Sequence, residues 1–256
     1  MSPVPDTPLA ARFIESPNFG ERRSGARPNC IILHYTGMPT AEAALGLLTD
    51  PASEVSSHYF VWEDGRIDQL VVEAARAWHA GKAFWKGESD LNSISIGIEI
   101  VNPGHEGGSP PFPDRQITAT TALARDILAR WSIPAERVLA HSDVAPGRKR
   151  DPGEVFPWRR LKEGGVGHWV EPAPITGEPI FRREEQGPPV RAMQAMLALY
   201  GYGVELTGVY DQRTRAVVEA FQRHFRPEQV DGEADPSTVA TLMALIEGLA
   251  PSRVSS

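Results

Sequence analysis

Hydrophobic and polar residues alternate most regularly between Ser93 and Val101. Isoleucines occupy positions 94, 96, 98 and 100, whereas Ser95, Gly97 and Glu99 lie between them. Because successive side chains of a strand point to opposite faces, this period of two predicts a strand with one apolar face. The small residues Ser95 and Gly97 leave space above the other face, on which Glu99 lies.

Shorter patterns around this strand predict a sheet combined with helices. Apolar runs bounded by turn residues predict four further strands, and Glu-Asp-Gly-Arg at positions 63–66 predicts a hairpin between two of them. Apolar residues at helical spacing predict a short helix and a long one, the latter capped by Asp114. The predicted strands are Cys30–Tyr35, Ser57–Trp62, Ile67–Val72 and Val138–His141, and the predicted helices are Thr40–Thr49 and Asp114–Trp131. Strands interleaved with helices indicate an α/β domain with a mixed central sheet flanked by helices, preceded by an irregular lead-in over residues 1–28.

The last quarter of the chain shows helical spacing only. Two of its helices open on the phrase Gly-x-x-Asp-x-x-Thr, in which Asp211 and Asp235 suit the N-cap and Pro236 suits the first helical position. We therefore predict a small all-α domain of three helices over residues 187–256. Its apolar stripes are Val190, Met193, Leu197 and Tyr200; Val217, Val218, Phe221 and Phe225; and Val239, Leu242, Ile246 and Leu249.

A proline-rich segment separates the two patterns. Residues 171–189 contain five prolines and charges of both signs, a composition typical of a linker. We place the linker at residues 173–186 and the α/β domain at residues 1–172. The helical domain is too small to be the enzyme, so we expect catalysis in the α/β domain and a targeting role for the helices.

Composition excludes several classes of protein. A net charge of -7 argues against a nucleic-acid-binding protein, and one cysteine excludes a disulfide framework or a thiolate-rich zinc site. No apolar run approaches the roughly 20 residues that a membrane span requires. The first 20 residues lack the pattern of a signal peptide, so composition leaves the cellular location open.

Chemically active residues are concentrated in the segment HSDVAPGRKRDPG at positions 141–153. It combines a histidine, two aspartates and three adjacent cations with two prolines and two glycines, which predicts an irregular loop. His34 and His141 each end a predicted strand, and Asp151 lies in this loop. Two imidazoles and one carboxylate are typical of a catalytic zinc site, which keeps its fourth position open. Asp143 competes with Asp151 as a ligand, and Asp151 could instead pair with an arginine of its own loop.

Glu99 and Lys149 are candidates for acid–base and electrostatic roles. A glutamate inside an isoleucine-rich strand would be costly to bury without a partner, so it either pairs with an arginine or acts as a general base with a raised pKa. Lys149 lies two residues before Asp151, where an ammonium group could stabilise an oxyanion or simply be solvated.

Five phrases between about residues 30 and 160 extend this pattern. In their order they resemble the zinc-dependent N-acetylmuramoyl-L-alanine amidases of the AmpD/AmiD type, which are related to phage T7 lysozyme and the peptidoglycan recognition proteins. The phrases are Ile32-Leu-His34-Tyr35-Thr36, Val55-Ser-Ser-His58-Tyr59, Ala77-Trp-His79-Ala-Gly81, Asn92-x-x-Ser95-Ile-Gly-Ile-Glu99, and His141-Ser-Asp through Gly147-Arg-Lys149-x-Asp151-Pro-Gly153.

The resemblance implies a reaction and a set of roles. It implies hydrolysis of the amide between N-acetylmuramic acid and L-alanine, with Glu99 as catalytic base and Lys149 as transition-state stabiliser. Ser57 stands where the phage branch has an active-site tyrosine, so that role is not transferred. The implied zinc ligands are His34, His141 and Asp151, and the implied substrate contacts are His58, Tyr59, Trp78 and His79.

Residues of about 187–250 resemble the bacterial three-helix peptidoglycan-binding domain. This resemblance favours a periplasmic or cell-wall-associated enzyme whose partner is peptidoglycan or its muropeptides. Three alternatives stay open: a cytoplasmic recycling amidase for anhydro-muropeptides, a recognition protein without catalysis, and a zinc carboxypeptidase acting on the stem peptide.

Overall fold

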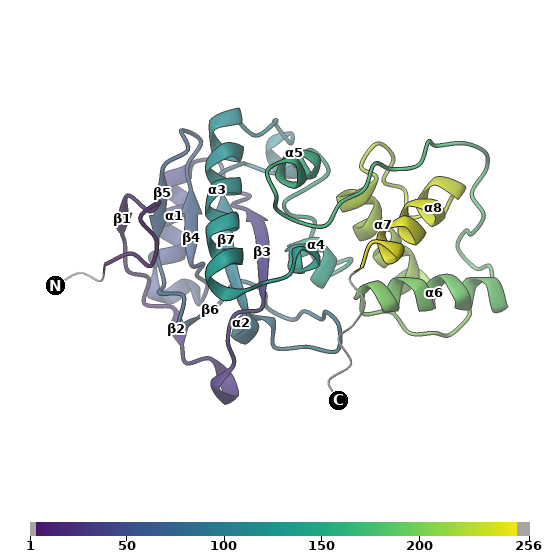
Figure 1. Cartoon of the computed structure of the whole chain (residues 1–256), viewed down its shortest axis with the longest axis horizontal. Coiled ribbons are helices and arrows are strands. Elements are labelled where there is room, and N and C mark those ends of the chain that lie inside the picture. Colours follow the sequence, from purple (N-terminus) through teal and green to yellow (C-terminus); the bar gives the residue numbers. More distant parts are fainter. Residues whose placement is uncertain (1–3, 250–256) are drawn as a thin grey trace.

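The computed structural model describes residues 4–249, which form a sheet with helices on both faces and a group of three helices beside it (Figure 1). The sheet has six strands in the order β1-β5-β4-β7-β3-β8, and all neighbours are parallel except β4 and β5. A separate antiparallel pair joins β2 (Phe19–Gly20) to β6 (Arg76–Ala77). The strands of the main sheet are β1 (Arg12–Phe13), β3 (Cys30–Tyr35), β4 (Tyr59–Val61), β5 (Ile67–Gln69), β7 (Ser95–Ile100) and β8 (Val138–Ala140). The predicted mixed sheet is therefore confirmed.

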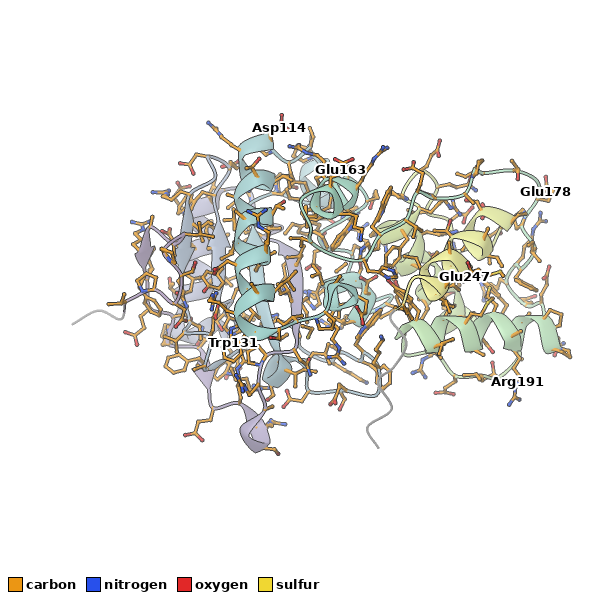
Figure 2. All side chains as sticks on the ribbon, viewed as in Figure 1. Asp114, Trp131, Glu163, Glu178, Arg191 and Glu247 are labelled. Carbon is orange, nitrogen blue, oxygen red and sulfur yellow. The ribbon has the colours of Figure 1, made fainter. Side chains whose placement is uncertain are left out.

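Helix α3 (Asp114–Trp131) covers one face of the sheet, and its ends are labelled in Figure 2. The isoleucines of β7 at positions 96, 98 and 100 are buried in one cluster with Ile117, Leu123 and Ile127 of this helix. The helix has the predicted bounds, but Pro113 occupies the cap position and Asp114 is the first helical residue. The predicted strand at Ser93 also begins later, because the short helix α2 (Leu91–Ile94) precedes β7.

Helix α1 (Ala41–Thr49) covers the opposite face. Alternate residues of β4 separate the two faces, because Tyr59 and Val61 belong to the α3 cluster whereas Phe60 packs with Leu48 of α1. The helix begins after Thr40, whose hydroxyl accepts a hydrogen bond from Ala43 N at 3.2 Å.

Two segments differ from their predicted conformation. Residues 12–13 and 19–20 of the lead-in are strands, and Arg12 is held by two hydrogen bonds to Asp68 at 2.9 and 3.1 Å. The segment after β8 starts as one helical turn, α4 (His141–Val144), and α5 (Trp158–Glu163) follows its loop.

The C-terminal part contains the three predicted helices, α6 (Pro188–Tyr200), α7 (Gln212–Phe225) and α8 (Pro236–Glu247). Both predicted caps form, because the carboxylates of Asp211 and Asp235 accept hydrogen bonds from Thr214 N at 2.8 Å and Thr238 N at 2.6 Å. No helix within residues 4–249 has the length and apolar character needed to cross a bilayer.

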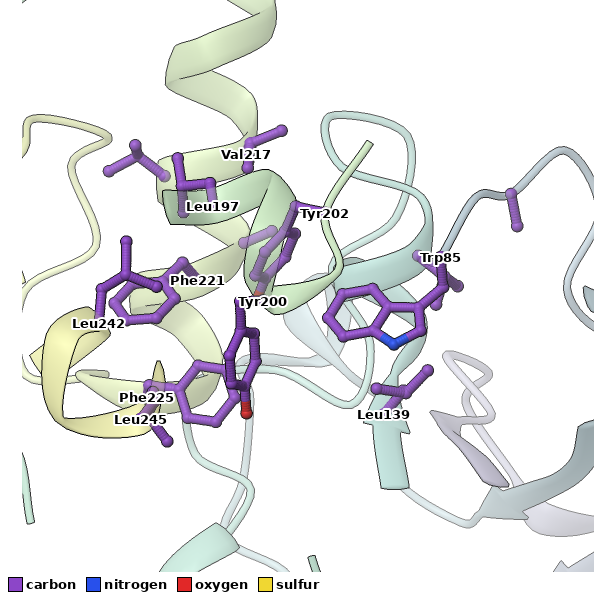
Figure 3. Packing of buried hydrophobic residues seen from close by; sticks show 14 of the residues in the cluster. Trp85, Leu139, Leu197, Tyr200, Tyr202, Val217, Phe221, Phe225, Leu242 and Leu245 are labelled. Carbon is purple, nitrogen blue, oxygen red and sulfur yellow. The ribbon is translucent and has the colours of Figure 1, made fainter. Parts of the chain in front are cut away.

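The two parts of the chain share a hydrophobic cluster. Figure 3 shows Trp85 and Leu139 of the first part beside Tyr200 and Tyr202 of the second, and the rings of Trp85 and Tyr202 lie 5.0 Å apart. The proline-rich segment is bound to the helices too, since Ala173 exchanges backbone hydrogen bonds with side chains of α8 and Phe181 pairs with Ala234. The shared cluster therefore joins two parts that composition predicts to be independent.

We expect Trp85→Ala to destabilise both parts together. Trp85 is 1% exposed, and removing a buried aromatic side chain costs about 3–5 kcal/mol of unfolding free energy. Urea unfolding followed by circular dichroism should show one transition that moves as a whole to lower urea. In the control variant Leu199→Ala, a residue 62% exposed, the unfolding free energy should change by less than about 0.5 kcal/mol. Two transitions, of which only one moves, would contradict the shared core.

Candidate functional site

The candidate site lies at the carboxyl ends of β3, β7 and β8, where open α/β sheets bind their ligands. His34 on β3 is paired in register with Glu99 on β7, and His141 directly follows β8. Asp151 reaches the same point from the loop after α4, because Ser142 N donates to the Asp151 carbonyl at 3.0 Å.

Three buried side chains converge at this point. His34 Nδ1 lies 2.9 Å from both His141 Nδ1 and Asp151 Oδ2, and the last two atoms are also 2.9 Å apart. The exposed fractions of the three residues are only 1%, 2% and 6%. The structure thus brings together the three ligands expected from the sequence.

A chain of hydrogen bonds determines which nitrogen of His34 carries the proton. Ser95 Oγ donates its only proton to the carbonyl of Leu91 at 2.6 Å, so His79 Nε2 must donate to Ser95 Oγ at 3.1 Å. His79 Nδ1 is then an acceptor, and His34 Nε2 donates to it at 3.0 Å. Burial lowers the pKa of His34 to about 4 and lowers that of His79 as well, so both rings are neutral and His34 Nδ1 keeps its lone pair.

His141 is oriented in the same way. Its Nε2 lies 3.1 Å from the carbonyl of Ala80, which can only accept, so the tautomer with its proton on Nε2 satisfies this contact and leaves Nδ1 with a lone pair. Burial alone would raise the pKa of Asp151, and positive charge at the two histidines lowers it well below its usual value; a bound cation would supply that charge in their place. With both histidines in these tautomers, two nitrogen lone pairs and a carboxylate oxygen face one point between them. This donor set fits a zinc ion, whose histidine ligands usually donate their other N–H to a fixed partner.

Within residues 4–249, Asp143 does not replace Asp151 beside the two imidazoles, and Asp151 does not pair with an arginine of its own loop. Asp143 is fully buried and accepts hydrogen bonds from Ala140 N at 2.8 Å and Tyr202 Oη at 2.7 Å, which turns it away from the two imidazoles. Arg148 donates to the carbonyls of Ala80 and Lys82, and Arg150 pairs with Glu106 at 3.1 Å.

Glu99 faces the cleft without a partner. Its Oε2 is buried and forms no hydrogen bond within residues 4–249, so the arginine salt bridge that the sequence allowed is absent there. Burial raises the pKa of Glu99 well above its usual value, Asp151 raises it further, and Lys149 opposes this shift. A raised pKa suits a carboxyl group to accept and return a proton during a reaction. The half-buried Lys149 lines the same cleft.

The cleft has a volume of about 400 Å³ and two unlike walls. One wall carries the converging ligands, Glu99 and three consecutive cations, Arg148–Arg150. The other is mainly apolar and comes from α1 and its neighbours. This wall was not predicted, because the sequence shows Leu47 only as an apolar residue of a short helix, whereas it is 44% exposed in the structure. The apolar residues of this wall are Met38, Ala44, Leu47, Leu48 and Val55.

The four implied substrate contacts occupy different places. Trp78 and His79 line the cleft. Tyr59 is fully buried in the sheet and donates to Glu73 at 2.7 Å, so its expected substrate contact is corrected to a core position. His58 is also fully buried, behind His79, and its Nδ1 accepts from Gly97 N at 3.0 Å. Its expected contact is likewise corrected to a supporting position beneath β7.

Comparison with protein families agrees with this geometry. The family profile described as N-acetylmuramoyl-L-alanine amidase matches residues 24–154, which include every residue of the site. A second profile, described as a peptidoglycan binding domain, matches residues 186–242.

Individual relatives cover both parts of the chain. AmiD, an N-acetylmuramoyl-L-alanine amidase of Escherichia coli, is 40% identical over 86% of this chain and 83% of its own length. The structure of E. coli AmiD with the substrate anhydro-N-acetylmuramic acid-L-Ala-D-γ-Glu-L-Lys aligns with a TM-score of 0.73 and 38% identity, over 90% of this chain and 97% of that one. The 1,6-anhydro-N-acetylmuramyl-L-alanine amidase AmpD of Haemophilus influenzae is 30% identical but covers only 58% of this chain and 89% of its own length. On its fold, its site and these matches, the chain belongs to the N-acetylmuramoyl-L-alanine amidase family.

Proposed function

We propose that this protein is a zinc amidase that hydrolyses the bond between N-acetylmuramic acid and L-alanine in peptidoglycan or its fragments. The observation that carries the proposal is the convergence of His34 Nδ1, His141 Nδ1 and Asp151 Oδ2 beside a carboxyl group, that of Glu99, whose buried oxygen has no hydrogen-bond partner within residues 4–249. Zinc held there would acidify a water molecule and polarise the substrate carbonyl.

The side chains around the three proposed ligands carry out the other steps of the reaction. Glu99 accepts the proton of the attacking water and later delivers it to the leaving amine of L-alanine. Lys149, on the same wall, stabilises the negative charge that develops on the carbonyl oxygen. His79 and Ser95 hold the His34 ring in the orientation and tautomer that expose Nδ1.

The two walls of the cleft suit the two halves of a muropeptide. The cations Arg148 and Arg150 can bind carboxylates of the stem peptide, whereas Trp78 and the apolar wall can pack against the sugar. The ligand in the AmiD complex combines the same two halves, an anhydro-sugar and an acidic peptide.

The helical part supports action on the cell wall. The peptidoglycan-binding profile covers residues 186–242. We propose that the helical part, at residues 187–256, binds peptidoglycan and that the protein is periplasmic or associated with the cell wall. A cytoplasmic recycling role is the second candidate, because AmpD of Haemophilus influenzae is 30% identical to this chain; that match covers only 58% of the chain. A recognition protein without catalysis is disfavoured by the complete set of ligands and the free Glu99.

Product analysis tests the reaction. Incubation with purified sacculi or soluble anhydro-muropeptides should release intact stem peptides with a free L-alanine amine, detected by mass spectrometry. Treatment with a chelator should abolish release, and added zinc should restore it, because the bound metal would activate the attacking water. Stem peptides shortened at their C-terminus would instead indicate a carboxypeptidase.

We expect Glu99→Gln to separate binding from catalysis. The amide keeps the size of the side chain but cannot accept the proton, so kcat should fall by roughly 10²–10⁴-fold while the zinc content stays at the level of the parent. Glu163→Gln on the exposed side of α5 is the matched control and should leave kcat unchanged. Equal kcat values for Glu99→Gln and the parent would contradict the role of Glu99 as base.

A further inference from the structure

Asp143 is a fully buried carboxylate that joins the two parts of the chain. Its Oδ1 accepts a hydrogen bond from Tyr202 Oη at 2.7 Å, and its Oδ2 accepts from Ala140 N at 2.8 Å and lies 2.6 Å from His224 Nδ1. Tyr202 and His224 belong to the helical part. Two of the three partners of Asp143 therefore come from outside the α/β part.

The connection ends at the turn that carries the proposed ligand His141. Helix α4 consists of this turn alone, and the bond from Ala140 N to Asp143 closes it. Ser142, which follows His141 in the turn, donates its backbone N–H to the backbone carbonyl of Asp151. Leu139, before the turn, and Val144, the last residue of the turn, are buried in the cluster shared with the helical part, as Figure 3 shows for Leu139.

Helix α7 also contacts the loop that carries Asp151. A side-chain carbon on Gly147 would lie 3.2 Å from Ala216 Cβ, so the two backbones approach closely before Asp151. After Asp151, Glu154 forms an ion pair with Arg223 at 3.4 Å. The ring of His224 stacks on Trp158 with their centroids 3.7 Å apart. The helical part thus contacts the chain on both sides of two of the three proposed ligands.

The burial of Asp143 makes this connection energetically important. Without the Tyr202 hydroxyl and the His224 imidazole, the one donor left to Asp143 within residues 4–249 would be Ala140 N. A buried carboxylate that loses its partners is strongly unfavourable, so the turn would move to rehydrate it. Because His141 begins that turn, the movement would displace a ligand, and small displacements of this kind are costly to catalysis.

We propose that the helical part is a positioning element of the metal site, which acts through Tyr202, His224 and Asp143 on the turn that bears His141. The inference rests on the proposed function and extends it: the helices that are expected to bind the wall also hold the catalytic geometry. Tyr202, His224 and Asp143 are positioning residues, since none of them lines the cleft or forms a hydrogen bond with the proposed ligand atoms.

The test compares two tyrosine variants of the full-length protein. Tyr202→Phe removes the hydroxyl that holds Asp143, whereas Tyr210→Phe removes an equally buried hydroxyl that donates to Gly232 O at 2.7 Å within the helical part. Zinc affinity is measured by competition with a chromophoric chelator, and kcat and KM are measured on a soluble anhydro-muramyl tripeptide. Thermal denaturation reports the loss of stability.

We expect both variants to melt at lower temperature, but only Tyr202→Phe to lose about tenfold in zinc affinity and in kcat, with KM within about twofold of the parent. Equal zinc affinity and kcat for the two variants would overturn the positioning role and leave the proposed function intact. A parent protein that neither binds zinc nor releases stem peptides would instead contradict the proposed function.

His224 offers an independent pair of variants. His224→Leu keeps an apolar side chain on Trp158 but removes the donor to Asp143, and we expect the same loss of about tenfold in zinc affinity. His224→Asn places an amide N–H near the position of Nδ1 and should recover most of that affinity. Equal zinc affinity for His224→Leu and the parent would count against the proposal, because packing alone would then maintain the site.

Discussion

The site depends on one electrostatic constraint: two imidazole nitrogens and a carboxylate oxygen, all buried, lie 2.9 Å from one another. Such an arrangement is unfavourable unless a cation fills it. The surrounding structure maintains it from both sides, because the relay from Leu91 through Ser95 and His79 directs one lone pair inward and the carbonyl of Ala80 directs the other. The proposed metal site therefore includes the residues that orient the two imidazoles as well as the three proposed ligands.

The two faces of β7 show how the sequence meets this constraint. Its isoleucines are buried against α3 and hold the strand in place, whereas Ser95 and Gly97 on the other face leave room for His79. A side-chain carbon at Gly97 would lie 2.6 Å from the His79 ring, so glycine is required for the relay to form. Glu99 follows on the same face and reaches the cleft. The alternation of large and small residues thus builds the core on one face and the site on the other.

Local patterns predicted much of this structure. The periodicity of β7, the apolar run of β3 and the bounds of α3 depend on neighbouring residues, as do the caps at Asp211 and Asp235. The chemistry of His34, His141, Asp151 and Glu99 was also visible in the sequence. Contacts between distant residues were not: Asp143 was a rival ligand until its partners, 59 and 81 residues further along the chain, were known. The burial of His58 and Tyr59 and the shared core around Trp85 depend in the same way on the tertiary fold.

The most direct test of the central claim is anomalous diffraction at the zinc absorption edge from crystals grown with zinc. We expect one strong peak bonded to His34 Nδ1, His141 Nδ1 and a carboxylate oxygen of Asp151, at about 2.0–2.2 Å from each. Density at this position that is bonded through Nε2 of either histidine would contradict the proton relay. An empty position between the three side chains, in crystals that hold zinc elsewhere, would contradict the metal site itself.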